Sequence, residues 1–251
     1  MILTKKRNFE AFIFVVPALL ILGTFVYFPL IKNIIYSFQS FTLSSTTREW
    51  VGLANYKQLF SDKIILACLK NNILYAVISI IVQVGFGLVL AAVLEDTVFQ
   101  KAAPFFRSVY FIPTVVSMTV VCLLFKFVYN PQMGLLNSFL QAVGLDNLTK
   151  IWLGSKKTAM YAVIAVSQWQ STGYVTMLFI VAIQKIPKDL YEAAEVDGAG
   201  KIKKFFYITV PQVKQMFFVT MILTVVGAFT VFNEPYILTG GGPGTATMVL
   251  S

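Results

Sequence analysis

The stretch YEAAEVDGAGKIKKFFYITVP, residues 191–211, is polar and charged, with its acidic residues first and its lysines after them. It lies between two long apolar runs, residues 159–184 and 213–238. An α-helix needs about 20 apolar residues to cross a bilayer, and both runs are long enough. A polar segment in this position predicts a loop outside the membrane that joins two membrane spans.

The composition supports a membrane protein. Hydrophobic residues make up 57% of the chain and charged residues 12%, with a mean hydropathy of +0.77, whereas about a quarter of the residues of a soluble domain are charged. The two cysteines, Cys68 and Cys122, are too far apart in sequence to indicate a disulfide framework or a metal cluster. The chain has no histidine, which excludes imidazole chemistry.

An all-α, polytopic membrane protein with five spans is therefore expected. The expected spans are 9–31, 72–94, 107–129, 159–184 and 213–238. The final residues, 238–251 (LTGGGPGTATMVLS), form a glycine-rich turn and the start of another segment. An odd number of spans leaves the carboxyl end outside the cell, so a sixth span is expected to follow.

Basic residues orient the expected spans. The triplet Lys-Lys-Arg at 5–7 and the lysines of 185–214 place the amino terminus and this loop in the cytoplasm. The net charge of +9 then reflects short cytoplasmic loops rather than nucleic-acid binding. On the outer side, residues 39–70 and 130–158 each predict a short surface helix.

Two short helices joined at a glycine are predicted within the cytoplasmic segment 185–212. Pro187 ends the preceding helix, and Asp189 lies in the first turn of the next one, where an acid complements the helix dipole. Gly198 supplies a turn. A second amphipathic stretch follows and stops at Pro211 before the next span.

The residues alone leave the function of this helix pair open. Its charges are consistent with a solvated loop kept out of the bilayer. Glu192, Glu195 and Asp197 are consistent with the acidic site of a polytopic membrane enzyme. Ala193 and Ala194 instead favour close approach to another protein, because they keep the helix thin.

The fourth expected span carries a polar stripe. Ser167, Gln170, Ser171 and Tyr174 recur at i, i+3, i+4 and i+7, so they share one face of a helix, and Trp169 is adjacent. Polar residues at this depth face a bundle interior or a water-filled path, and hydrogen bonding between helices explains them equally well. Hydroxyl, amide and aromatic groups together are what saccharide recognition needs.

The end of the fifth expected span has a second polar group. Thr230, Asn233 and Glu234 lie on one side, with Tyr236 close by. Glu234 is explained by an interfacial anchor or a helix cap, or by contact with a saccharide or a docked binding protein. The glycines of 240–244 lack the lysine of a phosphate-binding loop, so no ATP site is expected in this chain.

The spacing in the cytoplasmic segment resembles the EAA loop of ABC importer permeases, with the pattern E-A-A, three residues, G, nine residues, I-x-L-P. The matching residues are Glu192, Ala193, Ala194, Gly198, Ile208, Val210 (where leucine is usual) and Pro211. FFRSVYFIPTVVS (105–117), GLLNSFLQAVGL (134–145) and ILTGGGPGTAT (237–247) also resemble the carbohydrate, maltose-type branch of this family.

The resemblance implies a single permease domain, 1–251, in a bacterial inner membrane. It implies ATPase coupling through Glu192, Ala193, Ala194, Asp197, Gly198, Ile208 and Pro211. It favours a saccharide pathway at Ser167, Gln170, Ser171, Tyr174, Thr230, Asn233 and Glu234.

The implied partners are a second homologous permease subunit, two cytoplasmic subunits that bind ATP and Mg²⁺, an external solute-binding protein, the saccharide and membrane lipid. No catalytic residue, metal or cofactor is expected in the chain itself. The alternative is an ion-coupled secondary transporter or channel, which should carry charges deep in its spans, where this chain has almost none.

Overall fold

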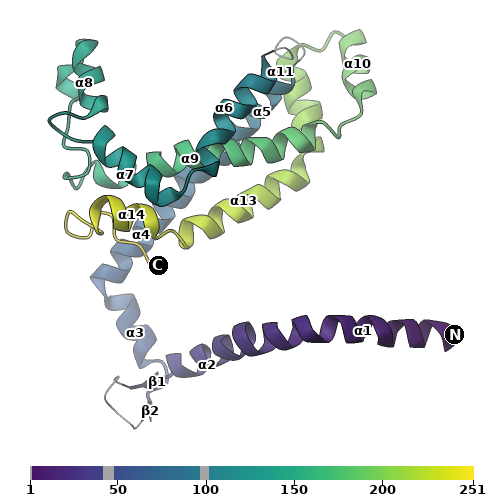
Figure 1. Ribbon diagram of the computed structural model, residues 1–251, viewed down its shortest axis with the longest axis vertical. Helices are drawn as coiled ribbons and strands as arrows, with labels where there is room; N and C mark the ends of the chain where they lie inside the picture. Colours follow the sequence, from purple (N-terminus) through teal and green to yellow (C-terminus); the bar gives the residue numbers. More distant parts are fainter. Residues whose placement is uncertain (1, 42–47, 97–101) are drawn as a thin grey trace. The chain divides into compact units, whose positions relative to one another are not determined.

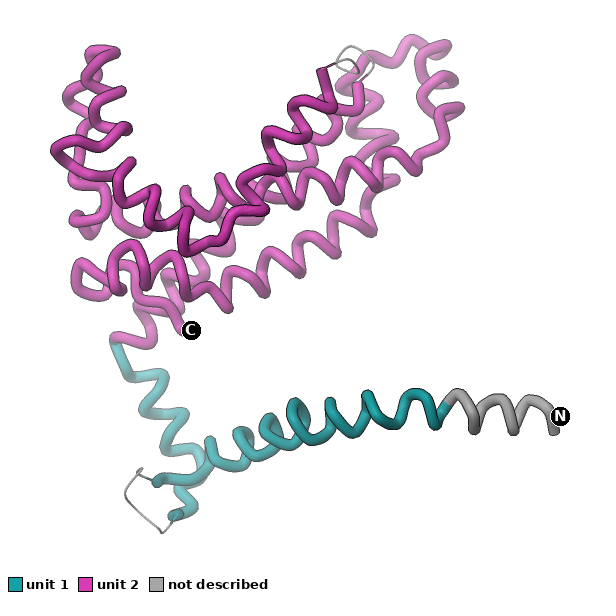
Figure 2. Tube along the Cα trace, viewed as in Figure 1, with its two compact units in different colours: residues 1–63 teal, residues 64–251 magenta. Residues whose placement is uncertain are grey.

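The computed structural model describes residues 2–41, 48–96 and 102–251, with side chains from residue 12 onward, and this part of the chain is mostly helical (Figure 1). It forms two compact units, residues 1–63 and 64–251 (Figure 2). The side chains of the basic triplet 5–7 lie outside the described residues. The all-α expectation is confirmed.

The first unit begins with a long helix. α1 (Ile2–Leu22), a π-helical turn (Gly23–Tyr27) and α2 (Phe28–Ser37) follow one another without a break. The stretch Phe12–Ser37 has a mean hydropathy of 2.3 and is long enough to cross a bilayer. It includes most of the expected span 9–31 and extends beyond its end.

A small hairpin and a surface helix complete the first unit. β1 (Gln39–Ser40) pairs antiparallel with β2 (Glu49–Trp50), and α3 (Ala54–Ser61) follows. The side-chain amide of Asn55 donates to two backbone carbonyls at the start of the hairpin, at 2.9 and 3.0 Å. The helix expected within 39–70 is thus present.

The second unit begins with another long, continuous helix. α4 (Lys63–Ser79), a π-helical turn (Ile80–Phe86) and α5 (Gly87–Glu95) form a candidate span of 33 residues with a mean hydropathy of 2.6. It contains the whole of the expected span 72–94.

The expected third span, 107–129, is wrong as a single helix. α6 (Ala103–Val115) and α7 (Met118–Val128) are bent by 99° at Val116 and Ser117, which have extended backbone. Pro113 lies in the last turn of α6, where it lacks the backbone donor that a continuing helix uses. The break separates two short helices that contact α9 in different places.

The segment 130–158 contains the helix expected there. α8 (Leu135–Ala142) and a 3-10 turn (Asp146–Leu148) fold over the buried Asn137 side chain. Its carbonyl accepts a hydrogen bond from the indole of Trp152 at 2.8 Å.

The central element is α9 (Ala159–Ile183), which packs against α5, α6, α7, α13 and α14. It matches the expected span 159–184. Its apolar residues join a buried core with α5, in which Phe179 and Val84 are fully enclosed. At Gly173 the backbone of α9 lies directly against the backbone of α6. A Cβ atom at this position would lie 1.8 Å from the carbonyl oxygen of Tyr110 in α6.

The helix pair expected within 185–212 is present. α10 (Lys188–Val196) is followed by a turn in which Gly198 has φ +71°, a conformation that favours glycine. α11 (Lys201–Lys204), a π-helical turn (Phe205–Thr209) and α12 (Val210–Gln212) then form one continuous helix. This helix ends one residue beyond the expected stop.

The expected fifth span, 213–238, is also wrong as a single helix. α13 (Lys214–Phe229) ends after 16 residues, and α14 (Asn233–Thr239) starts after a short break. Pro235 lies in the first turn of α14, where its missing backbone donor is tolerated, but it would interrupt a helix continued from α13. A bend of 72° separates α13 from the helix that precedes it.

Side chains of α4 hold the carboxyl-terminal segment against the second unit. The amide of Asn72 donates to the carbonyl of Ala228 at 2.7 Å and accepts from the backbone N–H of Leu250 at 3.0 Å. Asn71 donates to the carbonyls of Thr245 and Met248.

In the described part of the chain, two helices are long and apolar enough to span a membrane, and up to four if each bent pair forms one span. α9 is 25 residues long but is not among them, because the polar residues at its centre lower its hydropathy. The count of five spans therefore stays a prediction.

Candidate functional site: a polar cavity and the helix pair of 185–212

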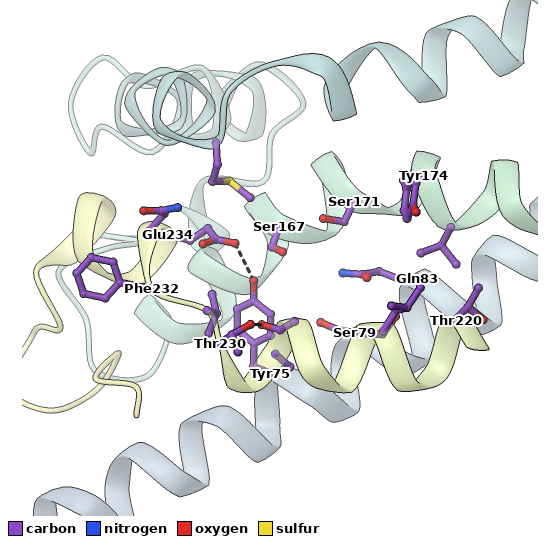
Figure 3. A pocket seen from close by; sticks show the side chains of 18 of the residues that line it. Tyr75, Ser79, Gln83, Ser167, Ser171, Tyr174, Thr220, Thr230, Phe232 and Glu234 are labelled. Carbon is purple, nitrogen blue, oxygen red and sulfur yellow. Dashed lines mark hydrogen bonds between the residues drawn. The ribbon is translucent and has the colours of Figure 1, made fainter. Parts of the chain in front are cut away.

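A cavity of about 380 Å³ lies within the second unit, between α4, α9, α13 and α14 (Figure 3). This volume falls in the range of small-molecule sites. Its wall combines hydroxyl, amide and carboxylate groups with aliphatic and aromatic side chains. The polar and aromatic residues of the wall are Tyr75, Ser79, Gln83, Ser167, Ser171, Tyr174, Thr220, Thr224, Thr230, Phe232, Asn233 and Glu234.

The cavity brings together six of the seven residues expected along a substrate path. Those six are Ser167, Ser171, Tyr174, Thr230, Asn233 and Glu234. They come from three helices or their ends, α9, α13 and α14, so residues about 60 positions apart in sequence share one wall (Figure 3).

Gln170 is the exception. It is absent from the wall, and its side-chain amide donates to the carbonyl of Val116 at 2.8 Å. The hydroxyl of Thr114 in turn donates to the carbonyl of Gln170 at 2.9 Å. The break between α6 and α7 leaves the carbonyl of Val116 without a helical partner, and the side chain of Gln170 supplies its hydrogen-bond donor. For Gln170, the structure thus shows hydrogen bonding between helices, which was the alternative to a place on the substrate path.

The sequence reasoning missed the contribution of α4 and most of that of α13. Tyr75, Ser79 and Gln83 recur at i, i+4 and i+8, and Thr220 and Thr224 at i and i+4. Each set lies on one helix face, so the same periodicity argument that selected α9 would have found them.

Glu234 is buried within the second unit. Its side chain is 7% exposed, and its Oε1 atom accepts a hydrogen bond from the hydroxyl of Tyr75 at 3.1 Å (Figure 3). It lies in the first turn of α14, where the helix dipole favours an acid. The carboxylate therefore belongs to the cavity wall.

Aromatic rings flank the cavity. Phe232 lines the wall and stacks on Tyr236, with the ring centroids 5.0 Å apart. Tyr174 lines the opposite side and is half-exposed. Trp169, expected to contribute, instead packs against Phe125 of α7 and is not among the wall residues.

The helix pair of 185–212 presents an exposed face and an anchored one. Glu192, Ala193 and Asp197 are exposed. The hydroxyl groups of Tyr191 and Thr209 are hydrogen-bonded at 2.9 Å, which links α10 to the helix that precedes α13. The exposed face is thus held on a fixed base.

Hydrophobic contacts reinforce this base. Tyr191, Ile208 and Val210 pack against the core that contains Phe179 and Val213. Ile208 is therefore a packing residue of this region rather than part of its exposed surface.

Ion pairs surround the helix pair. Glu195 pairs with Lys204 at 2.5 Å, and Asp96 at the end of α5 pairs with Lys201 at 2.9 Å. Glu95 bonds both Arg107 of α6 and the amide of Gln184. Within the described ranges, no three Asp, Glu, Cys or His side chains gather in a way that could hold a metal ion.

Comparisons with known proteins place the chain in a family. Residues 83–251 match the family model described as "Binding-protein-dependent transport system inner membrane component". The chain is 60% identical to the probable ABC transporter permease protein YurN of Bacillus subtilis, over 99% of this chain and 85% of that protein. It is 32% identical to the sulfoquinovosyl glycerol transport system permease protein SmoG of Agrobacterium fabrum, over 96% of this chain and 77% of that protein.

A solved structure shares the fold. It is a bacterial alginate ABC transporter in complex with an alginate pentasaccharide-bound periplasmic protein. The similarity has a TM-score of 0.80 at 21% identity and covers 97% of this chain and 80% of that one. The resemblance seen in the EAA spacing is confirmed, and membership makes the chain a transport component rather than an enzyme. The chain belongs to the binding-protein-dependent transport system inner membrane components, the permease subunits of ABC importers.

Proposed function

We propose that this chain provides part of the translocation pathway of an ATP-driven importer for a saccharide, with the cavity as its substrate contact. The support is the chemistry of the wall. Serine, threonine, glutamine and asparagine side chains supply donors and acceptors for sugar hydroxyls, and Phe232 and Tyr174 supply apolar ring surface. The relatives named for sulfoquinovosyl glycerol and alginate transport agree with a saccharide class.

The second part of the proposal is that α10 to α12 transmit ATP-driven motion to this cavity. The observation that carries it is a chain of contacts. Tyr191 bonds Thr209, and the carbonyl of Thr209 accepts from the N–H of Val213 at 3.0 Å. Val213 immediately precedes α13, which lines the cavity at Thr220 and Thr224. A displacement of α10 therefore has a packed route to the wall.

The residues proposed for ATPase coupling fall into two groups, one exposed and one packed against the rest of the unit. Glu192, Ala193, Asp197 and Gly198 belong to the exposed side, where an ATPase subunit would dock. Ile208 packs on the anchored side and Ala194 is half-buried, whereas Pro211 is exposed in α12. Small side chains on α10 allow close docking, and the left-handed turn at Gly198 sets the angle between α10 and α11.

The assembly follows from the family. A second permease subunit would complete the pathway, two cytoplasmic subunits would bind ATP and Mg²⁺, and an external binding protein would deliver the saccharide. The chain would act as one permease domain, 1–251, with five crossings, a cytoplasmic amino terminus and the loop 185–212 on the cytoplasmic face of a bacterial inner membrane.

The experiment is saccharide-stimulated ATP hydrolysis by the complete complex in proteoliposomes. Glu192→Lys and Gly198→Asp should each reduce the stimulated rate at least tenfold, because they alter the docking surface and the turn. Lys57→Glu, a charge change on the exposed α3, is the control and should keep the wild-type rate. Full stimulation in both loop variants would show that this segment does not transmit the ATPase motion.

A further inference from the structure

Glu234 differs in charge from the other residues of the cavity wall. It is the only acidic side chain among the wall residues of the described chain, and no lysine or arginine is among them. Lys126, in the last turn of α7, is exposed and is not part of the wall. Figure 3 shows the Glu234 carboxylate turned toward Tyr75, with the hydroxyls of α9 across the cavity.

The carboxylate has one partner within the described residues. Tyr75 donates to Oε1 at 3.1 Å. Oε2 is not one of the fully enclosed side-chain atoms that lack a partner in the described part of the chain. A carboxylate that is 93% buried needs donors, because burial removes the water that would otherwise solvate it. Glu234 lines the cavity, so a ligand that enters it can supply a further donor.

Ligands differ in whether they can do this. A sugar hydroxyl or an amino group donates to a carboxylate, and a charged amino group is also attracted to it. An ionised carboxylate, sulfonate or phosphate on the ligand offers only acceptors and would place a second negative charge beside Glu234. No basic wall residue described here would compensate that charge.

We propose that Glu234 is a specificity-determining residue that makes this cavity accept neutral or amino-bearing saccharides and reject acidic ones. The inference rests on the proposed saccharide function and narrows its substrate class. The fold does not decide this charge preference, since a solved structure with the same fold is of a transporter involved in the import of the acidic polysaccharide alginate.

The test must separate this cavity from the external binding protein, which selects substrates itself. We would therefore measure direct binding to the purified complex of the chain with its partner subunits, without the binding protein, by equilibrium dialysis. Three labelled disaccharides of matched size serve as probes. They are maltose (neutral), the glucosamine dimer (amino) and digalacturonate (acidic).

The wild-type complex should bind maltose and the glucosamine dimer at least tenfold more tightly than digalacturonate. Glu234→Gln keeps the shape and an acceptor for Tyr75, and it should reduce this preference by at least tenfold, mainly through tighter digalacturonate binding. The control Ser171→Ala removes a wall hydroxyl without changing charge, and it should weaken all three probes by similar factors.

Two results would overturn the inference in distinguishable ways. If the wild-type complex binds the probes but Glu234→Gln keeps the same ratio between them, Glu234 does not select charge and the saccharide cavity stands. If none of the probes binds to any of the proteins, the saccharide function of the cavity fails, and the charge selection fails with it.

Discussion

Gly173→Ala tests the packing on which the cavity depends. The new Cβ would lie 1.8 Å from the carbonyl oxygen of Tyr110 and 2.7 Å from its carbonyl carbon, whereas ordinary contact begins at 3.4 Å. α9 and α6 would have to separate locally by about 1.6 Å, and a backbone group cannot rotate away as a side chain can. Overpacking of this kind costs about 1–3 kcal/mol, and a backbone obstacle places it near the upper end.

Separation of the two helices would also strain the neighbouring hydrogen bonds. Thr114 donates to Gln170, and Gln170 donates to Val116, so this pair holds the α6–α7 break next to α9. Each bond contributes about 1 kcal/mol. The overpacking and the two bonds together amount to about 5 kcal/mol, which corresponds to a fall of about 10–20 °C in the midpoint of thermal unfolding.

The assay is thermal unfolding of the purified complex in detergent, together with saccharide uptake after reconstitution. Gly85→Ala is the matched control, because a Cβ there meets its nearest atom at 3.8 Å, an ordinary contact. It should leave the midpoint unchanged or raise it slightly, since alanine is favoured over glycine within a helix. A midpoint for Gly173→Ala within about 1 °C of wild type would refute the close packing of α6 on α9.

Three further changes have defined outcomes. Asn72→Leu leaves the carbonyl of Ala228 and the N–H of Leu250 without partners, so it should cost about 2–4 kcal/mol and speed proteolysis of the last ten residues, measured by mass spectrometry. Gly198→Ala forces a left-handed conformation and should cost about 1–2 kcal/mol in thermal unfolding, whereas Gly200→Ala, with φ −69° and open space around it, should be neutral. Tyr191→Phe removes the bond to Thr209 and should lower stimulated ATP hydrolysis several-fold while basal hydrolysis stays unchanged; an unaltered stimulated rate would contradict the route through this bond.

Periodicity and apolar length predicted much of the helical content. The long helices around 72–94 and 159–184 and the turn at Gly198 were predicted from local patterns, because each depends on neighbouring residues alone. Pro113 and Pro235 indicate a kink and a nearby helix end, but the 99° bend in 107–129 and the division of 213–238 into two helices were not predicted. The length of an apolar run indicates how many residues are kept from water, but it does not indicate where a helix changes direction.

The cavity could be predicted only in part for a related reason. Ser167, Ser171 and Tyr174 form a face that is visible in one helix, so their common orientation was predictable. The pairing of Tyr75 with Glu234 joins residues 159 positions apart and depends on how α4 packs against α14. The hydrogen bond of Gln170 was not predictable from one helix either. Its acceptor, the carbonyl of Val116, lies at the break between α6 and α7.

The central claim is that ATP hydrolysis by partner subunits drives a saccharide through this chain. The most direct test is saccharide uptake by proteoliposomes that contain the complete complex, with ATP inside and loaded binding protein outside, in the presence of ionophores that collapse all ion gradients. Uptake should persist and should depend on both ATP and the binding protein. Uptake that is lost with the ion gradients and continues without ATP would identify an ion-coupled transporter and contradict this account.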